Sequence, residues 1–377
     1  MILLNERPAM IFLQRRILFP LLLIVLHIDS YAQNPHKNVS LDVNTNFELF
    51  YAMYLSTDVD SVIMADKYSG FPLTTQLDFD LKRAYFNHFS KYKHAPQVKF
   101  YKDIASQGFL FGAPFNALLR VDSDMHITDS CYFNELPLPL EARESIVEFI
   151  GKLREFRDLS AFNDFYRQHK PQYDAIIETH KEKADLHHLV SQIEDYFGWG
   201  LNGYHVVLSP MMWPGGMSLT YTKNCAENGK DIYVCIGPKS VSSGMPVFGS
   251  DDEFQTVIVH ELVHPFIMHY CTKYREEVQK YAHLYDQNKQ VYQENGCPDW
   301  FSAINELLTR TVEIIINANG NDQQAMQEID HQSNDLGFSY IPVLYRAFET
   351  YYRQEIRKEP HPDFDGIFLK VLHSLEE

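Results

Sequence analysis

The alternation of hydrophobic and polar positions predicts helices towards both ends of the chain and a small sheet between them. Residues 204–208, 217–223 and 231–236 are rich in β-branched and aromatic side chains, which is typical of strands. Apolar residues recur every three to four positions in the predicted helices, which cover residues 45–56, 78–92, most of 138–195, 252–264 and beyond, 299–318, 338–356 and 364–375. This order predicts an α+β fold that is mainly helical, with a small sheet or hairpin before the helix that begins near residue 252.

The two later strands have a turn signal between them. Asn228-Gly229 is a pair that favours a two-residue hairpin turn. Such a turn fixes the register, because residues that face each other across it are equally far from its centre. If Asn228-Gly229 forms this turn, Thr222 lies opposite Cys235 and Cys225 lies opposite Ile232, which makes a bridge between Cys225 and Cys235 awkward.

The first 33 residues have the pattern of a secretory signal peptide. Arg15 and Arg16 precede an apolar run over residues 17–28, and Ser30-Tyr31-Ala32 provides small residues at a cleavage point near Ala32. The run is too short for a membrane span of roughly 20 residues, although a buried N-terminal helix or an anchor is the alternative. We expect an exported mature protein, periplasmic or secreted and without a membrane partner. It should have a mainly helical region at 34–200 and a catalytic region at 201–377, which we expect to form one compact unit.

Charge and cysteine content narrow the classes of partner and site. The chain has 33 basic and 50 acidic residues, a net charge of −17, and no basic patch. Such a surface repels phosphate backbones, so nucleic acid is not an expected partner. The five cysteines form no CxxC pair, which excludes a cysteine zinc knuckle. An exported chain can form disulfides, and Cys271 with Cys297 is the candidate bridge.

The stretch His260-Glu261-Leu262-Val263-His264 has the spacing of a zinc hydrolase motif. On a helix, residues four apart lie on one face, so both imidazoles can bind a single Zn²⁺ at about 2.1 Å. Glu261 lies between them and can take a proton from a water at the open position of the metal. A surface helix carries this spacing by chance in some proteins. The apolar residues around the motif indicate a buried helix instead, where two histidines and a glutamate need partners.

A catalytic zinc site needs a third protein ligand. Ile267 and Tyr270 stand where a metzincin would have glycine and histidine, so that class is excluded. The helix at 299–318 offers Glu306 and Glu313, which stand about 10 Å apart along it, so only one can reach the metal. We expect Glu306 to be the ligand and Glu313 to be the second choice. The alternative for Glu306 is an ordinary surface ion pair with Arg310.

His260–His264 followed by Asn305-Glu306 on a later helix resembles the gluzincin zinc metallopeptidases. More narrowly, the chain resembles an exported bacterial family of HExxH proteins that is described as a domain of unknown function. The similarity covers most of the mature chain and lies in four segments: Tyr85-Phe86-Asn87-His88-Phe89 with Tyr92-Lys93-His94, Val206-Val207-Leu208-Ser209-Pro210 with Gly215-Gly216, the HExxH motif, and Asn305-Glu306-Leu307-Leu308-Thr309-Arg310.

The resemblance implies one zinc per chain and Glu261 as general base. It also implies a peptide or protein substrate that pairs, extended, with an edge strand just before the metal helix. Arg310, His331 and Tyr340 are candidate donors to the transition-state oxyanion, and their order is open. The main alternative function is a non-catalytic, zinc-containing protein that binds peptide or glycan, and a third is a hydrolase that acts on another amide. The sequence says nothing of the oligomeric state.

Pro265 directly follows the second histidine of the motif. Proline inside a helix removes one backbone hydrogen bond and disfavours helical geometry at the preceding residue. The helix therefore either kinks at His264 or ends there. We expect a kink, because the motif itself is complete.

Overall fold

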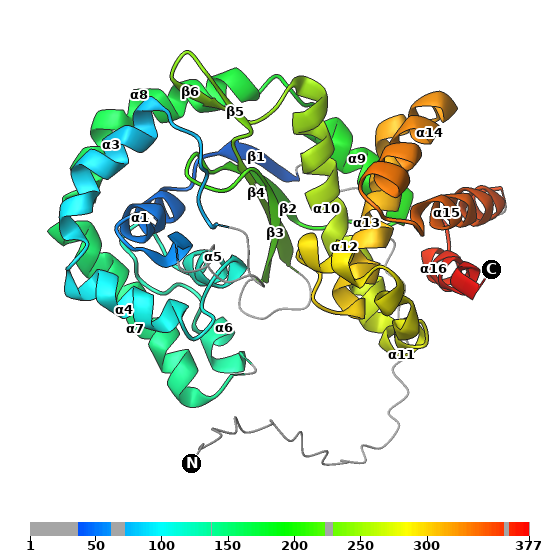
Figure 1. Cartoon of the computed structure of the whole chain (residues 1–377), viewed down its shortest axis with the longest axis horizontal. Helices are drawn as coiled ribbons and strands as arrows, with labels where there is room; N and C mark the ends of the chain where they lie inside the picture. Colours follow the sequence, from blue (N-terminus) through cyan, green and yellow to red (C-terminus); the bar gives the residue numbers. More distant parts are fainter. Residues whose placement is uncertain (1–36, 62–71, 137, 223–228, 358–361, 377) are drawn as a thin grey trace, which may run out of the picture. The chain divides into compact units, whose positions relative to one another are not determined.

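The protein has an α+β fold in which a small sheet lies between two groups of helices (Figure 1). The computed structural model describes residues 37–61, 72–136, 138–222, 229–357 and 362–376. Within it, residues His36–Glu377 form one compact unit. The expected signal peptide at 1–33 lies outside the described residues. No helix among the described residues is long and apolar enough to span a bilayer.

The first group of helices surrounds α1, which is buried along nearly its whole length. Helices α3, α4, α5, α7 and α8 all contact α1, and their aromatic side chains fill the space between them. The group consists of α1 (Thr45–Tyr54), α3 (Asp80–Phe89), the 3-10 turn η1 (Ser90–Tyr92), α4 (Pro96–Ala105), α5 (Gly112–Leu118), α6 (Ser130–Glu135), α7 (Leu140–Leu159) and α8 (Phe162–His180).

Helix α9 (Leu186–Phe197) leads from this group into the sheet. It ends at Gly198, whose φ of 76° is a left-handed conformation that glycine adopts without strain. The hydrophobic pattern predicted the helical character of residues 138–195. The structure divides that stretch into α7, α8 and α9, separated by short breaks near Ser160 and Ala184.

The central sheet has four strands in the order β1-β2-β4-β3. Strand β1 (Asn38–Asp42) pairs in parallel with β2 (Gly203–Leu208), β2 pairs in parallel with β4 (Lys230–Gly237), and β3 (Gly215–Thr222) pairs antiparallel with β4. Strand β3 is therefore an edge of the sheet, and its second side has no strand partner within the described residues. Two short strands, β5 (Ser240–Ser242) and β6 (Met245–Val247), form a separate hairpin.

The predicted register of the β3–β4 pair is wrong. Thr222 lies opposite Lys230, and Cys235 lies opposite Met217. Seven residues, 223–229, connect the two strands, so the connection is longer than the two-residue turn that the Asn228-Gly229 pair suggested. Residues 223–228 lie outside the described part of the chain.

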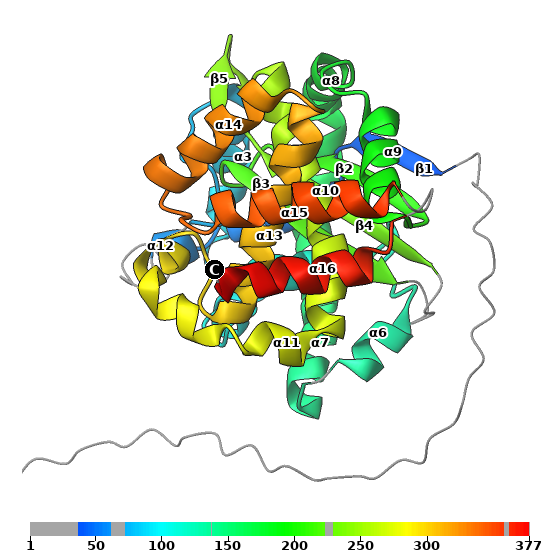
Figure 2. The ribbon, with the colours of Figure 1, turned by 90° about the vertical axis from the view of Figure 1, so that its right-hand side faces the viewer.

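The second group of helices begins with α10 (Asp251–Lys273), which packs against β3, β4, α9 and α13. Figure 2 shows α15 and α16 side by side, and both the contacts and the view place α15 against α13. The remaining elements are α11 (Arg275–Gln279), the 3-10 turn η3 (Ala282–Gln287), α12 (Lys289–Glu294), α13 (Trp300–Ala318), α14 (Asp322–Asp330), the π-helical turn η4 (His331–Asp335), α15 (Ile341–Glu355), α16 (Phe364–His373) and the 3-10 turn η5 (Ser374–Glu376).

Helix α10 runs through Pro265 without ending, so the alternative that it stops at His264 is wrong. A proline at 265 has no N–H for the carbonyl of Glu261, its partner four residues earlier in a regular helix. The missing backbone bond thus lies within the turn that carries the HExxH motif.

The expected bridge between Cys271 and Cys297 is also wrong, since both are free and buried. Cys271 faces Asn305 on α13, whereas the thiol of Cys297 donates to the carbonyl of Asn295 in its own loop. Among the described cysteines, Cys131 is the one in a disulfide.

Candidate metal centre

Helix α10 fixes the relative position of the two motif histidines. Ser250 caps the helix, since its hydroxyl accepts from the N–H of Glu253 and the Glu253 carboxylate accepts from the N–H of Ser250. Regular helix from there onward places His260 and His264 one turn apart on the side that faces α13. The spacing argument from the sequence therefore describes the local geometry correctly.

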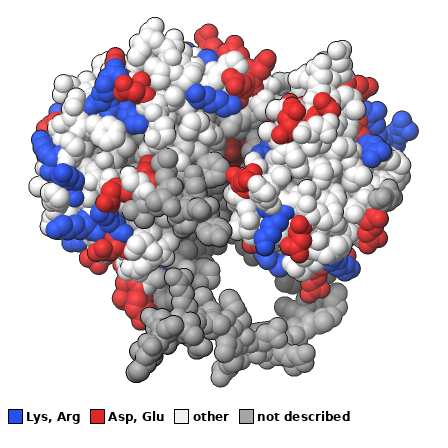
Figure 3. All heavy atoms as spheres, viewed as in Figure 1, with Lys and Arg blue, Asp and Glu red and all other residues white. Residues whose placement is uncertain are grey.

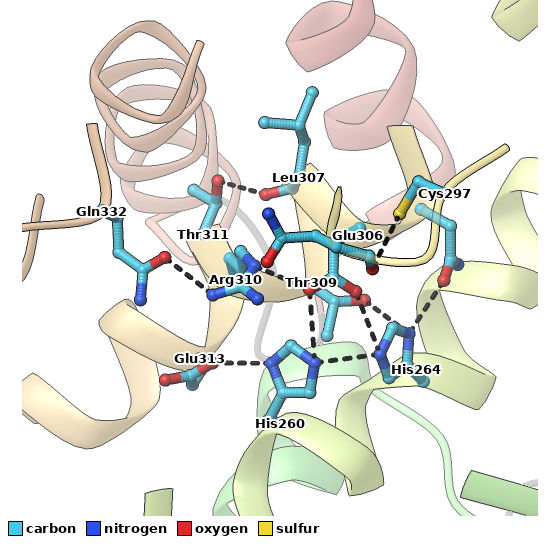
Figure 4. A network of polar contacts seen from close by, with 12 residues as sticks. His260, His264, Cys297, Glu306, Leu307, Thr309, Arg310, Thr311, Glu313 and Gln332 are labelled. Atoms are coloured by element: carbon cyan, nitrogen blue, oxygen red, sulfur yellow. Dashed lines mark hydrogen bonds and ion pairs between the residues drawn. The ribbon is translucent and has the colours of Figure 1, made fainter. Parts of the chain in front are cut away.

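The two imidazoles point their Nε2 atoms at each other, 3.0 Å apart (Figure 4). His260 Nδ1 lies 2.7 Å from a carboxylate oxygen of Glu313, and His264 Nδ1 lies 2.8 Å from the side-chain oxygen of Asn305. Both partners are acceptors, so both Nδ1 atoms carry hydrogen. In the neutral rings both Nε2 atoms then present lone pairs to each other, an arrangement that needs a proton or another cation between them.

Glu306 on α13 completes this group. Its Oε1 lies 3.7 Å from His260 Nε2, and its Oε2 lies 3.4 Å from His264 Nε2. Arg310, one turn further along, donates from Nε to Glu306 Oε1 at 2.6 Å. The ion pair that was the alternative for Glu306 is thus present, and it coexists with the approach of Glu306 to both histidines.

The two acidic residues of α13 occupy different sides of the histidine pair. Glu306 faces the Nε2 atoms, whereas Glu313 bonds to the Nδ1 atom of His260, on the other side of that ring. Glu313 is 4% exposed, so its hydrogen bond is shielded from water. This arrangement suits Glu313 for orienting His260, as an outer partner orients a ligating histidine.

Glu261 is buried against the edge strand. A side chain at Gly216 on β3 would place its Cβ 2.4 Å from Glu261 Oε1, so the carboxylate needs a glycine there. Glu261, His260 and His264 each offer a ligand atom within 4.8 Å of the others. The acid therefore lies beside the histidine pair and directly against the backbone of β3.

Burial and neighbouring charges shift the proton affinities of this cluster. Burial opposes the charged form of His260, but Glu306 and Glu313 raise the pKa of its imidazole well above the ordinary value. Burial, together with the adjacent His260, lowers the pKa of His264 to about 4. Burial also raises the pKa of Glu261 to about 7. At His260 the attraction of the carboxylates of Glu306 and Glu313 thus outweighs the cost of burial, so the cluster favours positive charge at this point.

The donor set fits a zinc ion. Two Zn–N bonds of about 2.1 Å in a tetrahedron put their nitrogens about 3.4 Å apart, close to the 3.0 Å between the two Nε2 atoms. The Glu306 carboxylate, 3.4 Å from His264 Nε2, can serve as a third ligand from the α13 side. Two neutral imidazoles and one carboxylate, each held by further hydrogen bonds, are ligands that zinc accepts.

The three candidate oxyanion donors have different surroundings. Arg310 lies in the cluster, where it also donates from Nη1 to Gln332 at 2.8 Å and stacks on the ring of Phe338. His331 is paired with Asp335 on its own turn, and Tyr340 donates to Gln287 on η3. The described contacts of His331 and Tyr340 are therefore with residues outside the histidine cluster.

Sequence reasoning missed Gln332, Asn305 and Gly216 as parts of this centre. Asn305 precedes Glu306 directly, and its place next to this candidate ligand was the available signal. Gln332 reaches Arg310 from the π-helical turn, and no local pattern announces that contact. The motif around Gly215-Gly216 was noted, but the contact with Glu261 depends on how β3 lies on α10.

The molecular surface is hollowed between the helices around α1, α3 and α4 and those of the second group (Figure 3). Acidic side chains are visible in the depth of this hollow. Of the motif residues, His260 and His264 are partly exposed, with 15% and 21% of their side chains accessible. Both imidazoles are therefore mostly buried but keep part of their surface accessible to solvent.

Comparison with family models matches residues 39–361 to a domain of unknown function, DUF4932. The match covers most of the chain, so the protein belongs to this family. No curated protein and no solved structure matches the chain.

Proposed function

We propose that this DUF4932 protein is an exported zinc-dependent metallopeptidase with Glu261 as its general base. The observation that carries the proposal is the convergence of His260, His264 and Glu306, with two Nε2 atoms 3.0 Å apart and a carboxylate within 3.7 Å of both. In this proposal the centre is of the gluzincin type, with two ligands from α10 and one from α13.

The chain's own residues would divide the work of peptide hydrolysis. His260, His264 and Glu306 hold one Zn²⁺ per chain, which when bound supplies a Lewis acid that polarises a carbonyl and acidifies water. Glu261 accepts the proton of the attacking water and passes it to the leaving amine. Glu313 and Asn305 hold the two Nδ1–H groups and so keep the Nε2 atoms aimed at the metal.

The edge strand β3 offers a place for the substrate. Every second residue of an edge strand turns its N–H and C=O away from the sheet, and an extended peptide can pair with these groups. Gly216 on this strand touches Glu261, so a peptide paired there passes next to the proposed base. The proposed substrate is therefore an extended peptide or protein segment.

We propose Arg310 as the oxyanion donor, because its guanidinium already lies next to Glu306 in the histidine cluster. His331 and Tyr340 stay as candidates whose described partners lie elsewhere. Export as a periplasmic or secreted protein, with cleavage of a signal peptide near Ala32, is likewise part of the proposal and rests on the sequence.

A test of the proposal compares the wild type with Glu261→Gln. The control is Asp252→Asn, a change of an exposed acid at the start of the same helix. Each protein is loaded with zinc, its metal content is measured, and turnover of a diverse peptide library is followed. The proposal expects one zinc per chain in all three, with turnover in wild type and control and a loss of about a thousandfold in Glu261→Gln.

Other outcomes would contradict the proposal in different ways. One zinc per chain with no cleavage by the wild type favours the alternative, a non-catalytic zinc-containing protein that binds peptide or glycan. Metal content that survives His260→Ala unchanged would show that zinc does not bind at this centre.

A further inference from the structure

Two aromatic side chains stand beside the start of the edge strand. Phe111 precedes α5, Trp213 precedes β3, and their ring centroids lie 6.4 Å apart at an interplanar angle of 81°. Phe111 is 40% exposed, and Trp213 is partly buried. Together the rings form an aromatic pair that is open to solvent.

The backbone at Phe111 is strained. Its φ of 51° with a ψ of −126° is a conformation that bulky residues rarely adopt and that glycine accepts readily. The next residue lies close to β3, because a Cβ added to Gly112 would be 3.3 Å from Leu219 and 3.6 Å from Met217. The packing of α5 on β3 thus holds an aromatic side chain at a position where its backbone is unfavourable. Such strain is found at functional sites.

The aromatic pair and Glu261 lie on opposite faces of the same part of β3. Side chains of a strand alternate between its two faces. Met217 and Leu219 face α5, and a Cβ on Gly215 would point the same way and lie 3.4 Å from Trp213 Nε1. Gly216 faces the other way, towards Glu261 on α10. Adjacent residues of one strand therefore touch the aromatic pair and the proposed base.

We propose that Phe111 and Trp213 form a subsite that selects an aromatic or large aliphatic side chain of the substrate. This inference rests on the proposed peptidase function and names its substrate class. An extended peptide paired with β3 alternates its side chains as β3 does. Alternate side chains of the peptide then face the metal centre, and the peptide side chain next to one of them faces the aromatic pair across Gly215. Apolar contact with two rings stabilises a large apolar side chain there more than a small or an acidic one.

The test uses Phe111→Gly in the full chain with zinc bound. Glycine tolerates the backbone at this position, so the variant keeps the fold while it loses the ring. The control is Phe86→Ala, which removes an equally exposed aromatic side chain from α3. The measured quantity is the ratio of kcat/KM for two matched peptides, one with phenylalanine and one with alanine at the position that faces the aromatic pair.

We expect Phe111→Gly to reduce this ratio about tenfold, mainly through KM, because one apolar contact in a pocket discriminates by that order. Phe86→Ala should leave the ratio as in the wild type. A wild type that cleaves peptides with no apolar preference, or a Phe111→Gly variant with an unchanged ratio, would overturn the subsite.

A second measurement separates the subsite from the reaction. Peptide binding to zinc-loaded Glu261→Gln is compared with binding to the double variant Glu261→Gln with Phe111→Gly. An apolar preference that the second change removes supports the subsite even if the wild type proves inactive, in which case only the peptidase function fails. Binding without such a preference contradicts the subsite whatever the activity.

Discussion

Glu48 on α1 and Glu261 on α10 are both buried carboxyl groups whose pKa burial raises to about 7. Their neighbours differ. Glu48 accepts hydrogen bonds at Oε2 from the hydroxyls of Tyr85 and Tyr173, at 2.8 and 3.2 Å, inside a closed set of helices. Glu261 lies beside two imidazoles and against an edge strand. Burial and a raised pKa therefore do not by themselves mark a catalytic group, and the neighbours must supply both the chemistry and the access.

The largest expected effect is a loss of zinc affinity when Glu306 or Glu313 is replaced, whereas replacement of Glu48 should have no such effect. Glu306→Ala removes a proposed ligand, so zinc affinity should fall by more than about a hundredfold. Glu313→Ala removes an orienting hydrogen bond and should cost about ten- to a hundredfold. Glu48→Gln should not change the affinity. Competition titrations with a chelator measure all three. A larger loss for Glu313→Ala would make Glu313 the ligand.

The second effect concerns the stability of the helices around Glu48. Its folded pKa of about 7 exceeds the ordinary 4.5, so the folded protein binds this proton more tightly than the unfolded chain does. The free energy of unfolding therefore loses a contribution as pH rises from about 4.5 to 7, and the loss is complete above 7. Relative to the wild type, Glu48→Gln should gain up to about 3 kcal/mol at pH 8 and little at pH 4.5.

Urea unfolding of both proteins at several pH values measures this difference. Groups other than Glu48 titrate equally in the two proteins and cancel when they are compared. A difference that is constant between pH 4.5 and 8 would show that Glu48 does not titrate with a raised pKa.

A third change alters the close approach of Glu261 to Gly216, to which Glu48 has no counterpart. Gly216→Ala would force a Cβ to within 2.4 Å of Glu261 Oε1, so the carboxylate must move. We expect turnover to fall by ten- to about a hundredfold, as for a displaced catalytic group, with zinc content preserved. The control is Gly151→Ala on α7, where an added Cβ meets nothing within 4 Å. Equal turnover of the two variants would argue against a role for the close approach.

The smallest effect is expected from the hydroxyls around Glu48. At pH 5.5, where this carboxyl is protonated in the folded protein, Tyr85→Phe should lower the free energy of unfolding by about 1 kcal/mol. Tyr173→Phe should cost less, because its hydrogen bond to Glu48 is longer. Denaturant midpoints of both variants measure this order. Turnover should remain that of the wild type, since neither side chain touches the metal centre.

Local spacing made much of the centre predictable. Four residues on a helix determine how His260 and His264 face each other, and the periodicity of α13 showed that Glu306 and Glu313 could not reach the same point. The helical pattern likewise predicted α1, α10 and α13 and the α+β class. These features depend on residues close together in the sequence.

What the sequence could not predict depends on contacts between distant segments. Strand β1 has five residues and pairs with β2, more than 160 positions later, so no local pattern announces it. The Asn228-Gly229 signal was outweighed by the pairing of β3 with β4, which places Thr222 opposite Lys230. The contact of Glu261 with Gly216 and the reach of Gln332 to Arg310 also require the folded arrangement.

Pro265 has a consequence for how the centre responds to a metal. It deprives the carbonyl of Glu261 of its helical donor, in the turn between the two histidines. One ion bound to His260 and His264 would cross-link that turn through its side chains and compensate for the missing backbone bond. A bound metal would then stabilise the helix that carries its ligands, and zinc should slow amide hydrogen exchange most in the middle of α10.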